Sequence, residues 1–269
     1  MGLSESRAAQ REEALRESLL RTATRVAEAM RETTEIIGAI AGGSLGRGGA
    51  IDAHSDADIW LLYRGAPPDP AAIERAWQAL DAKRVENGEF LVDGWRVEIS
   101  AHDAGVLAEE FHDLIALKTP DAPDENAHWM FYSVTLTDAE GAVAALKEEL
   151  NTYPETLRNR LIARATHAME KPARQARVCA GRGDLPAFWS CVTAFVTAYM
   201  DALFAFNRLW HPGPKRFLSL HLARCPRRPP AAADQLARLL DLESGAPSLA
   251  RAELVGSLHR ELLTLLASK

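Results

Sequence analysis

Two aspartates, Asp56 and Asp58, are separated by one alanine and followed by the apolar run Ile59–Leu62. On a strand, residues i and i+2 face the same side, roughly 6.5–7 Å apart along the backbone, so both carboxylates would project together. Two negative charges beside an apolar flank repel each other and are costly to desolvate. A divalent cation removes that cost, and Mg²⁺ commonly takes one or two carboxylates together with substrate phosphates and water. The pair therefore predicts a magnesium site that a polyphosphate completes.

A glycine-rich segment, beginning Gly42-Gly43-Ser44, precedes the two aspartates. Glycine lets the backbone approach phosphate oxygens and adopt positive φ, so that N–H groups point at an anion. We therefore predict Gly43 and Ser44 as phosphate contacts, with the Ser44 hydroxyl as an added donor. Arg47 is predicted to pair with a phosphate, and an ordinary exposed loop arginine is the alternative. The segment has neither the GKS or GKT of a Walker A loop nor the GxGxxG of a dinucleotide-binding turn.

Together these features resemble the signature of the DNA polymerase β-like nucleotidyltransferase superfamily, in which Gly-Ser is followed after a short spacer by Asp-x-Asp. Here the spacer is the eleven residues Leu45–Ser55. The resemblance implies a third carboxylate on a later strand, and Glu98, between two apolar residues, is predicted to supply it. A solvent-facing strand glutamate is the alternative for Glu98, and Asp93 is the fallback, although it is more typical of a turn.

The resemblance also implies a mechanism. Asp56, Asp58 and Glu98 would be the catalytic and metal-binding residues, holding one or two Mg²⁺ ions that bridge an NTP, with ATP as the expected donor. The ions would offset charge on the attacking and leaving oxygens while pyrophosphate departs. Whether Glu98 is a metal ligand or the general base for the acceptor hydroxyl stays open.

The second half resembles the C-terminal helical domain of small bacterial stand-alone nucleotidyltransferases, a group that includes relatives that modify antibiotics. The resemblance is carried by Phe204–Asn207 and His211–Phe217. The Pro-Gly-Pro within the second segment places Lys215 at the start of a helix, where helix N–H groups and the ammonium would hold the β- and γ-phosphates. An exposed basic residue is the alternative for Lys215.

Two further acids, Asp184 and Asp201, are possible contacts for a cationic acceptor. Asp201 lies within an apolar stretch, where an unpaired carboxylate is costly. The alternative is that Asp201 pairs with an arginine such as Arg208.

These residues must be positioned by an α+β arrangement. We expect a domain over residues 1–140, the nucleotidyltransferase domain with a mixed β-sheet flanked by helices, followed by an α-helical bundle domain over residues 141–269. The predicted elements are helices over 4–33 and 71–82, strands over 36–41, 59–63 and 130–136, and a hairpin of 90–92 and 95–99 around Asp93-Gly94.

The composition is that of an ordinary globular protein, with 47% hydrophobic and 25% charged residues. The net charge of −6 disfavours a long nucleic acid as partner. Three cysteines without zinc-site spacing are expected to be reduced thiols in a cytoplasmic protein. The apolar stretch Phe188–Trp210 is broken by polar residues, so we expect a buried helix and no membrane partner.

The leading hypothesis is a small-molecule nucleotidyltransferase that adenylylates an antibiotic such as an aminoglycoside, or a related metabolite. The first alternative keeps the chemistry but transfers AMP to a protein or tRNA, as in toxin–antitoxin pairs. The second alternative is a nucleotide-binding regulator without turnover.

Overall fold

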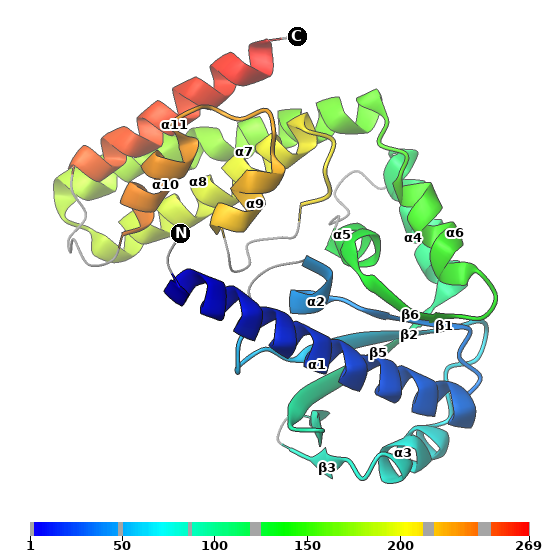
Figure 1. Ribbon diagram of the computed structural model, residues 1–269. Coiled ribbons are helices and arrows are strands. Elements are labelled where there is room, and N and C mark those ends of the chain that lie inside the picture. The colour runs from blue at the N-terminus through cyan, green and yellow to red at the C-terminus, as the bar shows by residue number, and fades with distance from the viewer. Residues whose placement is uncertain are drawn as a thin grey trace. The chain divides into compact units, whose positions relative to one another are not determined.

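A six-stranded mixed sheet forms the centre of the N-terminal part of the chain in the computed structural model (Figure 1). The strand order is β3-β4-β5-β2-β1-β6, and β2 and β5 pair in parallel while the other described pairs are antiparallel. The strands are β1 (Gly38–Ala41), β2 (Ala57–Tyr63), β3 (Lys83–Arg84), β4 (Phe90–Val92), β5 (Trp95–Asp103) and β6 (Val134–Asp138). The structure describes residues 3–47, 51–85, 88–118, 125–211, 218–241 and 249–268.

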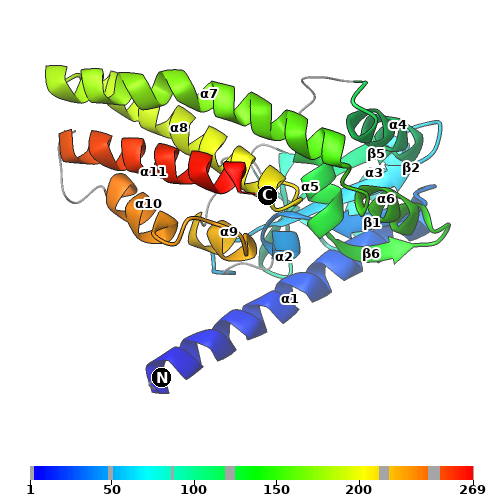
Figure 2. The ribbon, with the colours of Figure 1, turned by 90° about the horizontal axis from the view of Figure 1, so that it is seen from above.

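Helices cover both faces of this sheet. They are α1 (Leu3–Thr33), α2 (Gly43–Arg47), α3 (Pro70–Ala79), α4 (Ala104–Ile115), α5 (Glu125–Tyr132) and α6 (Ala142–Leu150). The long helix α1 lies along one face, and α4 and α6 lie on the opposite side (Figures 1 and 2). The apolar stripe of α1, including Val26 and Met30, is fully buried in one core with Ile59 and Leu61 of β2. The predicted amphipathic helix is thus confirmed, because its apolar face is what packs on the sheet.

Alternation along the strands puts the acids on the other face. Since Ile59 and Leu61 face α1, Asp58 and Trp60 point to the opposite side. The parallel register of β2 and β5 then sets a second row beside them, with these partners: Asp58 with Glu98, Trp60 with Ser100, and Leu62 with His102. The face opposite α1 therefore carries two adjacent rows of side chains, one with Asp58 and the other with Glu98.

The region around residue 130 differs from the prediction. Met130 and the two residues after it belong to α5, and the strand begins at Val134. A short apolar run does not distinguish a strand from one face of a helix, and Ala127 and Met130, three apart, are both buried. The hairpin is confirmed, with Asp93 and Gly94 both at positive φ. The helix α4 was not expected from the sequence pattern.

The chain divides into a sheet unit, Met1–Thr152, and a helical unit, Tyr153–Lys269. The sequence pattern placed the division after residue 140. Helix α6 belongs to the sheet unit because Val143 and Leu146 are buried there, and the Val143 side chain packs closely on Gly38 of β1. The predicted fold class is confirmed, since a mixed sheet with flanking helices is followed by a unit built of helices.

The helical unit packs around one long apolar helix. Its members are α7 (Glu155–Arg182), α8 (Leu185–Phe206), α9 (Leu218–Arg224), α10 (Ala232–Leu240) and α11 (Leu249–Ala267). Phe188, Phe195 and Leu203 of α8 are fully buried in its core. Helix α8 is long and apolar enough to cross a membrane by length and composition alone. Half of its most apolar 18-residue stretch is buried inside the protein. A core helix passes the same test, as we expected for this stretch.

Tyr199 of α8 offers a test of this core. Its ring is fully buried, its hydroxyl has no hydrogen-bond partner among the described residues, and burial raises the pKa of the phenol. An unsatisfied buried hydroxyl is unfavourable, so Tyr199→Phe is expected to raise the free energy of unfolding by about 1 kcal/mol. Chemical denaturation measures this change. Tyr63→Phe, at a half-buried strand position, is the control and should change little; a destabilised Tyr199→Phe would mean that the hydroxyl is satisfied.

Candidate functional site

A cavity of about 180 Å³ opens on the sheet face opposite α1. Its lining comes from β2, β5 and α5: Asp58, Ile59, Trp60, Glu98, Ser100 and Trp129. Asp58 is half-buried and Glu98 is exposed, and the two are direct partners in the parallel ladder. The structure therefore brings together one of the predicted aspartates and the predicted third acid, forty residues apart in the chain.

Asp56 lies one residue before β2 and is half-buried. Ala57, between the two aspartates, is fully buried in the core that includes α1. This burial fixes the position of the backbone between Asp56 and Asp58. The preceding turn is held by its own side chains, because the Asp52 N–H donates to Ser55 Oγ at 3.1 Å and the Ser55 N–H donates to the Asp52 carbonyl at 3.1 Å. The entry into β2 is therefore fixed by local hydrogen bonds.

The described part of the glycine-rich segment, Gly43–Arg47, forms the five-residue helix α2 rather than an open turn. Gly43 has a φ of +53°, and a Cβ there would lie 2.1 Å from Asp58 Oδ2. A Cβ on Gly42 would lie 1.7 Å from the Trp129 ring, and one on Gly46 would lie 2.8 Å from the Tyr132 carbonyl oxygen. These glycines are thus required by close approach of other parts of the protein, a reason that the sequence did not reveal.

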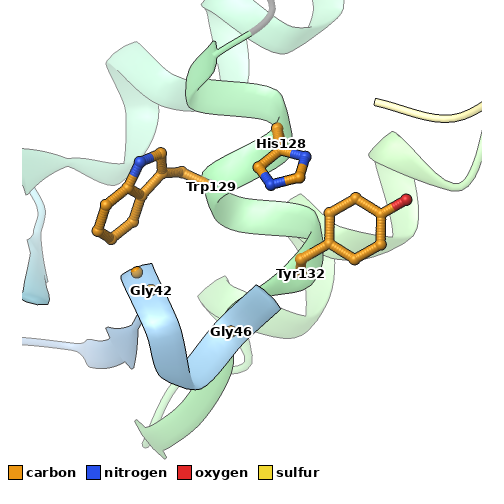
Figure 3. A pocket seen from close by; sticks show the side chains of 6 residues that line it. Gly42, Gly46, His128, Trp129 and Tyr132 are labelled. Atoms are coloured by element: carbon orange, nitrogen blue, oxygen red, sulfur yellow. The ribbon is translucent and has the colours of Figure 1, made fainter. Parts of the chain in front are cut away.

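A much smaller hollow, of about 10 Å³, lies between α2 and α5 (Figure 3). Its lining is Gly42, Gly43, Gly46, His128, Trp129 and Tyr132. Figure 3 shows the Trp129 ring beside Gly42 and the Tyr132 ring at the Gly46 end of α2. Trp129 also stacks on Trp60, with ring centroids 5.2 Å apart and planes 2° apart, so one indole contributes to both cavities.

The remaining predicted phosphate contacts are placed only in part. Ser44 lies in α2 and is buried. Arg47 ends α2, but its side chain lies outside the described residues, as does the whole of Lys215. Their roles stay predictions.

Ser100 and His102 were missed in the sequence. They follow Glu98 at the next two same-face positions of β5, so strand alternation was the signal that would have found them. Ser100 Oγ lies 2.9 Å from His102 Nε2, and the His102 ring stacks on Trp60 with centroids 4.1 Å apart. Burial lowers the pKa of His102, against an opposing effect of the Glu110 charge.

The donor chemistry of the cavity fits magnesium. Asp58 and Glu98 offer hard carboxylate oxygens on one wall, and Mg²⁺ commonly takes one or two carboxylates and completes its shell with substrate phosphate and water. Across the described ranges, no three His, Cys, Asp or Glu side chains are grouped so that they hold a metal ion by themselves. The three-ligand set of Asp56, Asp58 and Glu98 stays a prediction.

The acids considered in the helical unit have structural partners. Asp184 caps α8, accepting from the Ala187 N–H at 3.2 Å. Asp201 lies 2.5 Å from His211 Nδ1, and Arg208 pairs with Glu155 instead. The alternative that Asp201 pairs with Arg208 is therefore wrong.

Asp103 holds the ends of the two strands that carry the acids. Its carboxylate accepts from Gly105 and Val106 at the start of α4 and from Gly65 after β2. These N–H groups, Gly105 most strongly, hold the pKa of Asp103 below its ordinary value. A lowered folded-state pKa stabilises the protein above the unfolded pKa of about 3.9, and this contribution is lost as the pH falls through the folded value.

We therefore expect Asp103→Ala to lower the melting temperature near neutral pH, with a deficit that shrinks below about pH 4. Thermal unfolding across a pH series measures this. Glu140→Ala, which removes an exposed partner of Arg64, should change little at any pH. A deficit for Asp103→Ala that is independent of pH would contradict the role of the carboxylate charge.

The chain was compared with known proteins. A family model described as a domain of unknown function, DUF4037, matches residues 123–216. That range does not include the segment from Gly43 to Asp58. No curated protein sequence matches the chain. The chain is similar to the crystal structure of a nucleotidyltransferase-like protein from Exiguobacterium sibiricum 255-15, at 14% identity and a TM-score of 0.41, over 90% of this chain and 71% of that one.

Proposed function

We propose that this protein is a magnesium-dependent nucleotidyltransferase that moves a nucleoside monophosphate from an NTP, with ATP as the expected donor, to a hydroxyl of a small-molecule acceptor. The observation that carries the proposal is the pairing of Asp58 with Glu98 on one wall of a cavity. Carboxylate oxygens from two adjacent strands are hard ligands of the kind that Mg²⁺ takes together with substrate phosphates and water. A bound Mg²⁺ supplies charge stabilisation at the attacking and leaving oxygens.

Each of the site residues predicted from the sequence would have a role in this scheme. Asp56, Asp58 and Glu98 would hold the ion, and Gly43 and Ser44 would contact the triphosphate from α2. Arg47 would contribute positive charge to the same phosphates, and the sequence favours Lys215 as a further phosphate contact. The protein then acts by holding the α-phosphorus in line with the acceptor oxygen.

The acceptor is proposed to be small and cationic, such as an aminoglycoside or a related metabolite, which would make this a resistance enzyme. The net charge of −6 supports a cationic acceptor. Transfer to a protein or tRNA is the second candidate, and the same net charge disfavours the tRNA.

A thermal-shift experiment tests nucleotide and metal together. A ligand that binds only the folded state stabilises it by RT ln(1 + [L]/Kd), which is about 2.7 kcal/mol at one hundred times Kd. We expect the melting temperature to rise with ATP and Mg²⁺ together, and little with either alone. A shift with ATP that is the same in EDTA would contradict the proposal.

Turnover is tested by pyrophosphate release. The four NTPs are screened with Mg²⁺ against aminoglycosides, lincosamides and nucleosides, and products are identified by mass. A metal-dependent shift without turnover on any acceptor would favour the regulator alternative.

A further inference from the structure

Ser100 and His102 form a hydroxyl–imidazole pair at the cavity. Ser100 lines the cavity that Asp58 and Glu98 also line, and its Oγ lies 2.9 Å from His102 Nε2. A hydroxyl within hydrogen-bond distance of an imidazole, with the imidazole held by a further group, is the arrangement that enzymes use to move a proton from oxygen. Neither residue has a role in the scheme above.

The surroundings of His102 hold it in the form that accepts a proton. Its ring stacks on Trp60, which itself stacks on Trp129, so the imidazole is fixed in orientation. Burial lowers its pKa, which leaves the ring neutral near pH 7, and Glu110 of α4 is the acidic group that acts on it. With the proton of the neutral ring on Nδ1, Nε2 is free to accept from the Ser100 hydroxyl.

Ser100 also lies where an acceptor would meet the acids. Along β5, Glu98, Ser100 and His102 succeed one another on the same face, roughly 6.5–7 Å apart at each step. A group held over Asp58 and Glu98 would therefore have the Ser100 hydroxyl as its next neighbour toward His102. If Asp58 and Glu98 are both metal ligands, a different group must take up the acceptor proton. Ser100 and His102 lie next to Glu98 on β5, and His102 Nε2 is able to accept that proton.

We propose, on the basis of the proposed function, that Ser100 and His102 relay the proton of the acceptor hydroxyl. As the acceptor oxygen bonds to the α-phosphorus and the bond to pyrophosphate breaks, the acceptor proton passes to Ser100 Oγ. The Ser100 proton passes at the same time to His102 Nε2, giving an imidazolium. Glu98 is then left as a metal ligand, which resolves the two roles considered for it. Ser100 touches the acceptor, and His102 acts through Ser100.

Steady-state kinetics with matched variants test the relay. His102→Phe keeps a ring against Trp60 but removes Nε2, and Ser100→Ala removes the hydroxyl. Each should lower kcat by about a hundredfold or more with little change in the KM for ATP, because general acid–base catalysis contributes that much to the rate. Ser100→Thr restores a hydroxyl and should recover most of the rate. His167→Phe, on an exposed face of α7, is the control and should leave both constants unchanged.

A second measurement does not depend on turnover. Imidazole ¹⁵N NMR of the ligand-free protein should show a neutral His102 whose Nε2 signal moves in Ser100→Ala but not in His167→Phe. If that signal moves and no NTP is turned over, the pair is real and the proposed function fails. If turnover is metal-dependent but both substitutions leave kcat unchanged, the relay fails and the proposed function stands. A nucleotide adduct on Ser100 would also overturn the relay, since Ser100 would then be the acceptor itself.

Discussion

Replacing Asp58 with asparagine is expected to lower nucleotidyl transfer by ~10³-fold or more, because metal-ion stabilisation of transition-state charge is worth several kcal/mol. The substitution preserves the shape of the side chain and removes its charge beside Glu98. Near-normal folding is therefore expected, with a melting temperature close to that of the unsubstituted protein. Pyrophosphate release and thermal unfolding measure the two effects on the same samples.

Asp81→Asn is the matched control for Asp58→Asn. Asp81 is exposed in the same unit at a φ of 51°, a conformation that asparagine adopts readily. It should leave both transfer and stability nearly unchanged. A large loss of folding in Asp58→Asn would show that the carboxylate is structural, and full retention of transfer would reject its place in the metal site.

Gly43→Ala is expected to damage both the fold and the site. The added Cβ would lie 2.1 Å from Asp58 Oδ2, and the φ of +53° is unfavourable for alanine by about 1–2 kcal/mol. The carboxylate or the start of α2 must move, so we expect a loss of stability larger than the backbone cost and a loss of transfer comparable to that of Asp58→Asn. Denaturant unfolding and pyrophosphate release measure these effects.

Gly141→Ala separates the two contributions. Gly141 has a φ of +71° in the same unit, and no described atom lies within 4 Å of its Cβ position, so this variant bears the backbone cost alone. Asp58→Ala removes the atom that collides with the new Cβ at Gly43. If collision causes the excess destabilisation, the double variant with Gly43→Ala should be more stable than the two single effects predict. Strict additivity would mean that the close approach has no energetic effect.

The sequence predicted which residues belong to the site better than it predicted how the elements bring them together. Periodicity two correctly placed Asp58 opposite the apolar face of β2, whereas Asp56 lies one residue before the strand, and apolar neighbours identified Glu98 as a strand residue. That Asp58 and Glu98 are direct partners depends on β2 and β5 pairing in parallel, which local pattern does not specify. Trp129 was missed because Met130 and its neighbours were interpreted as a strand, whereas they belong to α5.

The glycines show the same limit. A glycine-rich segment before two aspartates indicates a close approach of the backbone to something, but it does not say to what. In the structure, Gly42 lies against Trp129 of the distant helix α5, and Gly43 lies against Asp58 of the next strand, β2. Only tertiary packing distinguishes this use of glycine from contact with a ligand.

The parallel pairing of β2 and β5 has a consequence for how the site forms. Parallel strands require a crossover, here residues 64–94 with α3, β3 and β4, and that loop closes at an entropic cost before any non-local contact compensates for it. We therefore expect the two acids to meet late in folding, so that any repulsion between them acts on the same step. High salt, which screens that repulsion, should speed refolding of the native chain more than refolding of Asp58→Asn. A nascent chain that ends before β5 contains Asp56 and Asp58. It lacks Glu98, Ser100 and Trp129, which line the cavity together with Asp58.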